Sequence, residues 1–350
     1  MTSSSPQSTT HRLRRGVLAL LLCLLLLEIS VRLPPVHAAL STALDPYESL
    51  LWYDNSMLAY QNLLRDGQQH DLWMLGSSYM MTALDPRIVQ AQLAATGNLT
   101  TVQNYGYTVM QNLSDMAVVV ERWMFSFYKP RYALIGLHWG NFSADGRRTA
   151  RARTSPMERS LIFQDTLNDR LGGVIYRNSA LFRFATLARN ALTIAPERTV
   201  IPTLTEGGYT AAVTDKVFGC DPTSYTDVNK VTQEQFDSHL VRLDTLIDAL
   251  QRNGVTVGVV SIPNSYCSYR RFYATPEDYV QLYLDPLAAH LQARGISYAE
   301  LDRRFFSAYP DGEEQASFYY NASHAKLKGA ELFSAWTGEF VASWLNGQEQ

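Results

Sequence analysis

The sequence predicts an α/β fold in which helices cover both faces of a parallel β-sheet. Short apolar runs alternate along the chain with amphipathic stretches, which is the pattern of successive β-α units. Two of these runs, 132–137 and 255–262, are almost entirely apolar, as in strands that are buried on both sides. The 350 residues are 46% hydrophobic and include 20 Tyr, 14 Phe and 6 Trp. This content supplies a substantial core and excludes a disordered chain.

The first half of the chain contains three expected strands. The first, 71–75, is followed by a Gly-Ser-Ser turn and a helix-like stretch, and the second covers 99–103. Apolar residues then recur at helical spacing over 109–128, until Pro130. Because proline does not continue a helix, the apolar run 132–137 is expected as the third strand.

The second half of the chain repeats the alternation after a long interruption. In chain order we expect a helix over 236–250, a strand over 255–262, a helix over 278–294, a strand over 296–301 and a last helix over 326–345. We therefore assign residues 39–350 to one α/β domain with an insertion at 144–230, which is expected to form a cap region.

The N-terminus has the pattern of an export signal. Three Arg residues within 12–15 precede an unbroken apolar run over 16–27. Residues 36–38 resemble a small-residue cleavage site, whereas the apolar pattern continues beyond the run, as in an uncleaved anchor. Residues 1–38 are therefore a removed signal peptide or a membrane anchor, and both place the domain outside the cytoplasm, at the cell surface or in the periplasm.

Composition excludes several classes of protein. The formal net charge of −3 gives no electrostatic basis for binding nucleic acid. A single apolar run excludes a polytopic membrane protein. His and Cys residues lack the spacing of metal ligands, so no metal or other cofactor is expected. After the N-terminal segment only Cys220 and Cys267 remain, and in an oxidising compartment they form a disulfide or stay as two thiols.

Polar residues follow each of the first three strands at the edge where an open α/β sheet binds its ligands. Ser78 follows the first strand, Gly106 the second and Asn141 the third, while His324 lies just before the last helix. Each residue alone is weak as an indication of function. Their order along the chain is more informative.

That order resembles the SGNH/GDSL hydrolase superfamily. Its first block is similar to Trp73-Met74-Leu75-Gly76-Ser77-Ser78, with Ser77 in place of the usual Asp. Its later blocks are similar to Asn104-Tyr105-Gly106, to Asn141, and to residues 320–334 around His324. In detail the pattern looks closest to membrane-anchored SGNH-like proteins of bacterial surface-polysaccharide acylation pathways.

The resemblance implies a three-layer α/β/α (flavodoxin-like) fold and acyl-transfer chemistry. Ser78 would be the nucleophile and His324 its base, with Asn321 at the position of the family's Asp. Asn can orient an imidazole but does not stabilise its charged form as a carboxylate does. Three readings stay open: a Ser-His dyad, an acid such as Asp302 or Asp311 acting instead, or an inert site.

The same resemblance implies further site residues and a class of substrate. The N–H groups of Ser78 and Gly106 and the Asn141 amide would hold the oxyanion. Independently of the resemblance, three aromatic residues are neighbours of these positions in the sequence, and their flat rings are expected to stack on sugars: Tyr105, Trp139 and Tyr320.

The implied function is an exported esterase or O-acyltransferase that acts on a surface polysaccharide or another acylated glycan. The alternative is an inert glycan-binding or scaffold protein that partners a membrane-bound O-acyltransferase. In both cases the N-terminal helix would contact the membrane if it is an uncleaved anchor, and the protein would be secreted if it is cleaved.

Overall fold

The computed structural model describes most of the chain. The described residues are 6–43, 60, 64, 68–107, 110, 112–142, 159–193, 203–204, 210–211, 231–269, 273, 275–320 and 324–348.

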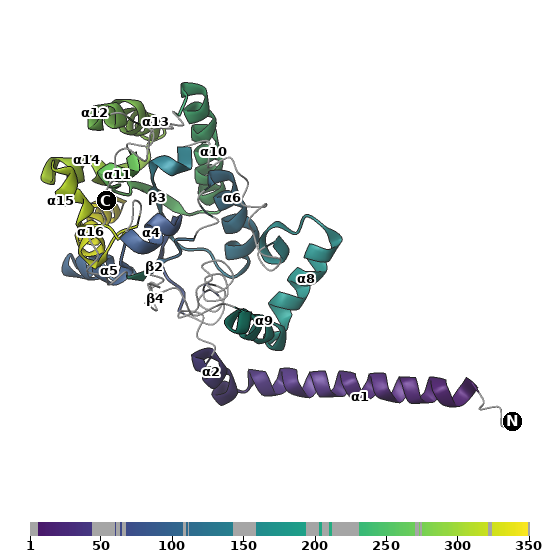
Figure 1. Cartoon of the computed structure of the whole chain (residues 1–350). Helices are drawn as coiled ribbons and strands as arrows, with labels where there is room; N and C mark the ends of the chain where they lie inside the picture. Colours follow the sequence, from purple (N-terminus) through teal and green to yellow (C-terminus); the bar gives the residue numbers. More distant parts are fainter. Residues whose placement is uncertain are drawn as a thin grey trace.

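Five parallel strands form the central sheet and confirm the predicted α/β class (Figure 1). They are β1 (Leu72–Gly76), β2 (Val102–Asn104), β3 (Tyr132–Leu137), β6 (Thr256–Ser261) and β7 (Ser297–Glu300). Their order across the sheet is β2-β1-β3-β6-β7. β1 pairs with β2 on one side and with β3 on the other, so the direction in which the chain adds strands reverses between β1 and β3. In sheets of this kind, ligands bind at the carboxyl ends of the strands on either side of that reversal.

Helices cover both faces of the sheet, which gives three layers. Alternate side chains of β1 enter two separate cores: Trp73 and Leu75 lie in one, and Leu72 and Met74 lie in the other. The first core contains α6 (Leu113–Val118), α10 (Gln233–Arg252) and α13 (Asp285–Ala293). The second contains α5 (Pro86–Ala95), α14 (Leu301–Ala308) and α16 (Leu327–Gln348).

Two predicted helices are less regular than their apolar spacing indicates. The helix expected over 109–128 is α6, a π-helical segment η2 (Val119–Trp123) and a 3-10 turn η3 (Met124–Ser126). The helix expected over 278–294 is α12 (Pro276–Tyr279), a π-helical segment η9 (Val280–Leu284) and α13. Pro286 has no N–H to continue the α-helical ladder, which accounts for the wider turn that precedes it.

Part of the predicted insertion is described. It contains η7 (Arg159–Phe163), α8 (Leu167–Asn178), α9 (Ala180–Thr193) and a short antiparallel pair, β4 (Thr203–Leu204) and β5 (Thr210–Ala211). η7 packs against η2, and β5 contacts α4 (Ser78–Ala83), which carries the candidate nucleophile. Cys220 lies outside the described residues, and so does the predicted disulfide with Cys267.

The N-terminal segment forms α1 (Pro6–Arg32) and α2 (Pro34–Ala43). The leucines of α1 between Leu18 and Leu27 are 44–69% exposed. A search of the described residues finds no helix with the length and apolar character needed to cross a membrane. Figure 1 shows α1 projecting from one edge of the molecule, with only the end next to α2 lying beside α9.

Candidate functional site

A tight turn after β1 presents two consecutive serines. Gly76 ends the strand, and a Cβ at this position would lie 2.6 Å from the Cβ of Met80, so no larger residue fits. Ser77 caps the short helix α4, since its Oγ accepts a hydrogen bond from the Tyr79 N–H at 3.3 Å. The next residue, Ser78, is only 8% exposed.

Ser78 meets His324 across the fold. Their Oγ and Nε2 atoms are 3.0 Å apart, although 246 residues separate them in the chain. A narrow loop holds His324 in place: Tyr319 and Ala325 form a β-bridge, and the Tyr320 N–H donates to the His324 carbonyl at 3.0 Å. The nucleophile and base expected from sequence are therefore brought together.

The surroundings of His324 keep its imidazole neutral. Burial lowers the pKa of His324 to about 4, because the charged form loses its hydration. The ring stacks on Tyr320, with centroids 5.6 Å apart, and lies 5.4 Å from the ring of Tyr79. A neutral imidazole removes the proton of a serine hydroxyl when the ring nitrogen that faces the hydroxyl is the unprotonated one.

A second Ser-His pair lies beside the first, and sequence reasoning missed it. The Oγ of Ser77 is 3.0 Å from Nε2 of His138, the residue that follows β3. The backbone N–H of Gly140 donates to Nδ1 of His138 at 3.0 Å. A backbone N–H only donates, so Nδ1 is unprotonated and the proton of the neutral ring is on Nε2. His138 therefore donates its hydrogen bond to Ser77.

Burial also fixes the protonation state of His138. The residue is fully buried, and this burial, together with the neighbouring His324, lowers its pKa to about 3. Tyr79 stacks on its ring, with centroids 3.6 Å apart and planes inclined by 13°. The Ser77–His138 hydrogen bond therefore connects the residues that follow β1 and β3, and it holds the serine turn in position.

The predicted oxyanion donors differ in their environments. The N–H of Gly106 donates to Oδ1 of Asn104 at 2.7 Å, so this donor is engaged within the protein. The Asn104 Nδ2 group in turn donates to the carbonyls of Met80 and Leu84, which ties the loop after β2 to α4. The Asn-x-Gly spacing is the only trace of this clamp in the sequence.

Asn141 lies in the turn after β3 and is fully buried. Its Oδ1 accepts the His138 N–H at 2.9 Å, and its own N–H donates to the His138 carbonyl. Asn141 thus supports the loop that carries His138. The same side chain carries the Nδ2 donors that an oxyanion role requires.

The three aromatic residues expected to stack on sugars occupy different places. Tyr105 is 0% exposed and packs against Trp73, and Trp139 is 6% exposed with its Nε1 donating to Ser268 at 3.0 Å. Both rings are core residues because the packed neighbours leave no surface for a sugar. Tyr320 is half-buried and lies beside His324 at the site.

The group that completes a Ser-His-acid triad is not among the described contacts. Asn321 lies outside the described residues. The two substitute acids have other roles: Asp302 accepts hydrogen bonds from the N–H and side chain of Asn264, and Asp311 caps α15 (Gly312–Ala316). Burial raises the pKa of Asp302 to about 7.

Comparison with protein-family models finds no match for the chain, and comparison with curated proteins finds no relative. The chemistry proposed below therefore depends on the arrangement of the site itself.

Proposed function

We propose that the protein is an exported serine esterase or O-acyltransferase of SGNH-like type that acts on an acylated cell-surface glycan. The observation that supports this most is the Ser78–His324 contact of 3.0 Å at the carboxyl ends of the central strands. This contact lies near the ends of β1 and β3, between which the winding of the sheet changes direction. Sheets with this flavodoxin-like strand order bind their ligands at that point.

The reaction proceeds through an acyl-enzyme. The Oγ of Ser78 attacks the ester carbonyl while Nε2 of His324 takes its proton, and the proton then passes to the departing alkoxide. The Ser78 ester that remains is attacked by water in a hydrolase or by a sugar hydroxyl in a transferase, again with His324 as base. The Ser78 N–H and the Asn141 amide are the donors proposed for the oxyanion.

The export pattern of residues 1–38 supports a location outside the cytoplasm, where polysaccharides are accessible. The half-buried ring of Tyr320, beside the base, is the aromatic surface available for a sugar. A membrane-bound O-acyltransferase is the proposed supplier of the acyl group in the transferase version of this function.

One observation favours the alternative, an inert glycan-binding or scaffold protein. The SGNH resemblance implies that the Gly106 N–H belongs to the oxyanion hole, but this group already donates a hydrogen bond to Oδ1 of Asn104. Loss of one such donor costs on the order of 10²–10³ in rate.

Release of acetate from an O-acetylated polysaccharide separates the two functions. We expect the full chain to release acetate, Ser78→Ala to release none, and the matched control Ser77→Ala to keep the activity. Folded protein without activity on any acylated glycan or on a 4-nitrophenyl ester favours the scaffold instead.

The role of Asn321 has its own test. If Asn321 stands where the family has Asp, then Asn321→Asp stabilises the charged imidazole and raises the rate, because the reverse change in a serine protease costs about 10⁴ in kcat. A slower Asn321→Asp variant shows that this residue does not orient His324.

A further inference from the structure

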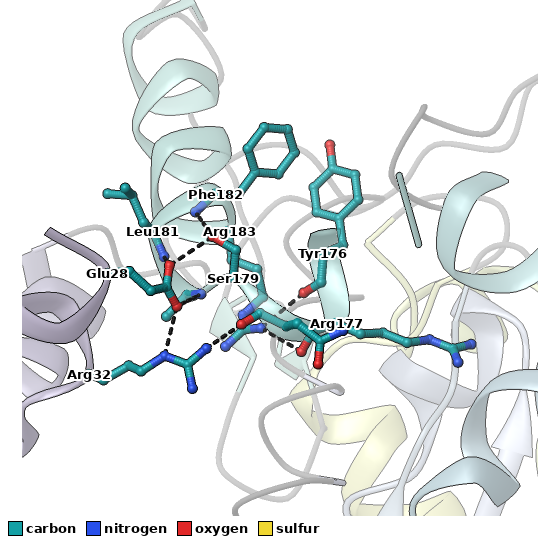
Figure 2. Close-up of polar contacts among 10 residues, drawn as sticks. Glu28, Arg32, Tyr176, Arg177, Ser179, Leu181, Phe182 and Arg183 are labelled. Carbon is teal, nitrogen blue, oxygen red and sulfur yellow. Dashed lines mark hydrogen bonds and ion pairs between the residues drawn. The ribbon is translucent and has the colours of Figure 1, made fainter. Parts of the chain in front are cut away.

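The end of α1 is tied to the insertion by a carboxylate. Glu28 accepts hydrogen bonds from the Ser179 hydroxyl at 2.8 Å and from the N–H groups of Ala180 and Leu181 at 2.9 and 3.0 Å (Figure 2). These are the first amides of α9, which have no partners within the helix. A negative charge is also favoured there by the helix dipole.

The facing end of α8 is held by cations. The buried Arg183 donates to the carbonyls of Tyr176 and Arg177 at 2.9 and 3.2 Å, and Arg32 donates to the carbonyl of Asn178 (Figure 2). Arg32 also pairs with Glu28 at 2.7 Å. The α8–α9 hairpin and the end of α1 are therefore one unit, in which both helix termini meet charges of the favourable sign.

The outer face of α8 is apolar. Leu167, Leu171, Val174 and Ile175 fall at the spacing of one helix face, and they are 45–71% exposed. These four exposed side chains of α8 form what we call the hairpin patch.

The inner face of α8 carries two glycines and one large buried side chain, Tyr176, but no large aliphatic residue. A Cβ at Gly173 would lie 2.4 Å from the Ser160 carbonyl oxygen, so the helix approaches η7 through its glycines. An ordinary surface helix buries its large aliphatic residues and turns its polar or small ones to water. In α8 this arrangement is inverted, which indicates that the outer face meets an apolar medium.

We propose that the hairpin patch is a second membrane-binding surface, which enters the outer part of the bilayer beside α1. This inference rests on the exported location that we propose and, of its two forms, on the one in which residues 1–38 stay attached as a membrane anchor. A lipid surface is favoured over a protein partner because the leucines of α1 are exposed on all sides of that helix, and Glu28 fixes the end of α1 to the hairpin that carries the patch. Two apolar elements hold a protein at a bilayer more firmly than one.

Photo-crosslinking of the full chain in vesicles of phosphatidylethanolamine and phosphatidylglycerol tests this inference. A benzophenone side chain is introduced in place of Val174 in the patch, Leu22 in α1, or Val241 on the far helix α10. Val241 is the matched control because it is a valine with 65% exposure outside the patch. The thermal midpoint of each variant confirms that it is folded.

We expect lipid adducts at positions 174 and 22 and none at 241. Adducts at 22 without adducts at 174 overturn the inference and leave the anchor in place. Adducts at 174 that join two copies of the chain overturn it in favour of a dimer. Absence of lipid adducts at both 22 and 174 overturns the inference together with the proposed membrane location.

Discussion

The two Ser-His pairs of the site have the same distance, and the proposed function gives them opposite roles. Ser77 and His138 are 3.0 Å apart, and so are Ser78 and His324. The Gly140 N–H fixes His138 as the donor to Ser77, so that imidazole has no lone pair directed at a hydroxyl proton. Proximity of Ser and His is therefore not sufficient for nucleophilic catalysis, and the partner on the second ring nitrogen decides the role.

The largest expected difference between the two pairs comes from removal of the proposed base. His324→Gln keeps the approximate size of the side chain but not the proton acceptor, so reaction of Ser78 with a fluorophosphonate should slow by about 10²–10⁴-fold. The matched control His290→Gln changes a histidine that pairs with Asp244 away from the site, and it should react at the original rate. Equal rates in all three proteins contradict the role of His324.

The pH dependence of labelling tests whether the imidazole of His324 is neutral in the folded protein. Since burial lowers the pKa of His324 to about 4, the base stays neutral from pH 8 down to about 5. The labelling rate, measured at each pH in protein shown to be folded, should fall roughly tenfold per unit only below pH 4. An inflection near the ordinary histidine pKa shows that the imidazole is hydrated in solution.

Removal of His138 should affect stability more than chemistry. His138→Ala leaves the Gly140 N–H without its acceptor and Ser77 without its donor in a buried region, which costs about 1–3 kcal/mol. Denaturant unfolding at pH 7 measures this loss. A rate loss as large as that of His324→Gln, with stability unchanged, means that His138 is the base.

Acid should destabilise the wild-type protein through both rings. Their folded pKa values lie below the ordinary value of 6.5, so only the unfolded state takes up protons at first as the pH falls. Stability is retained above pH 6.5 and is lost as the pH falls toward 4, and His138→Ala should show a shallower slope in this window.

The smallest expected effect on labelling is that of Ser77→Ala. This change removes the acceptor for the Tyr79 N–H and for the buried Nε2–H of His138, at a cost of about 1–3 kcal/mol in the free energy of unfolding. Labelling of Ser78 should continue. Complete loss of labelling in folded Ser77→Ala means that the two serines do not have separate roles.

Local sequence patterns predict the sheet and part of the site. The apolar run 132–137 has the same first and last residues as β3. A strand that is buried on both faces is apolar at every position, so the apolar run marks both of its ends. The strand-end rule accounts for the position of Ser78. The pairing with His324 is expected from the family resemblance instead, because His324 lies before the last helix and follows no strand of the sheet.

Other features depend on contacts between distant residues and have no local pattern. The donor role of His138 follows from a backbone N–H two residues later, and the burial of Tyr105 follows from packing against Trp73. The apolar residues on the exposed face of α8 have the same spacing as those on the buried face of an ordinary helix. This spacing predicts that the segment is helical, but it does not predict which face of the helix packs against the protein.

The central claim is that His324 activates Ser78 whereas His138 only positions Ser77. The most direct test is to react the folded protein with a fluorophosphonate and locate the adduct by mass spectrometry of its peptides. We predict an adduct on Ser78 and none on Ser77. An adduct on Ser77, or folded protein that carries no adduct on Ser78, would contradict the claim.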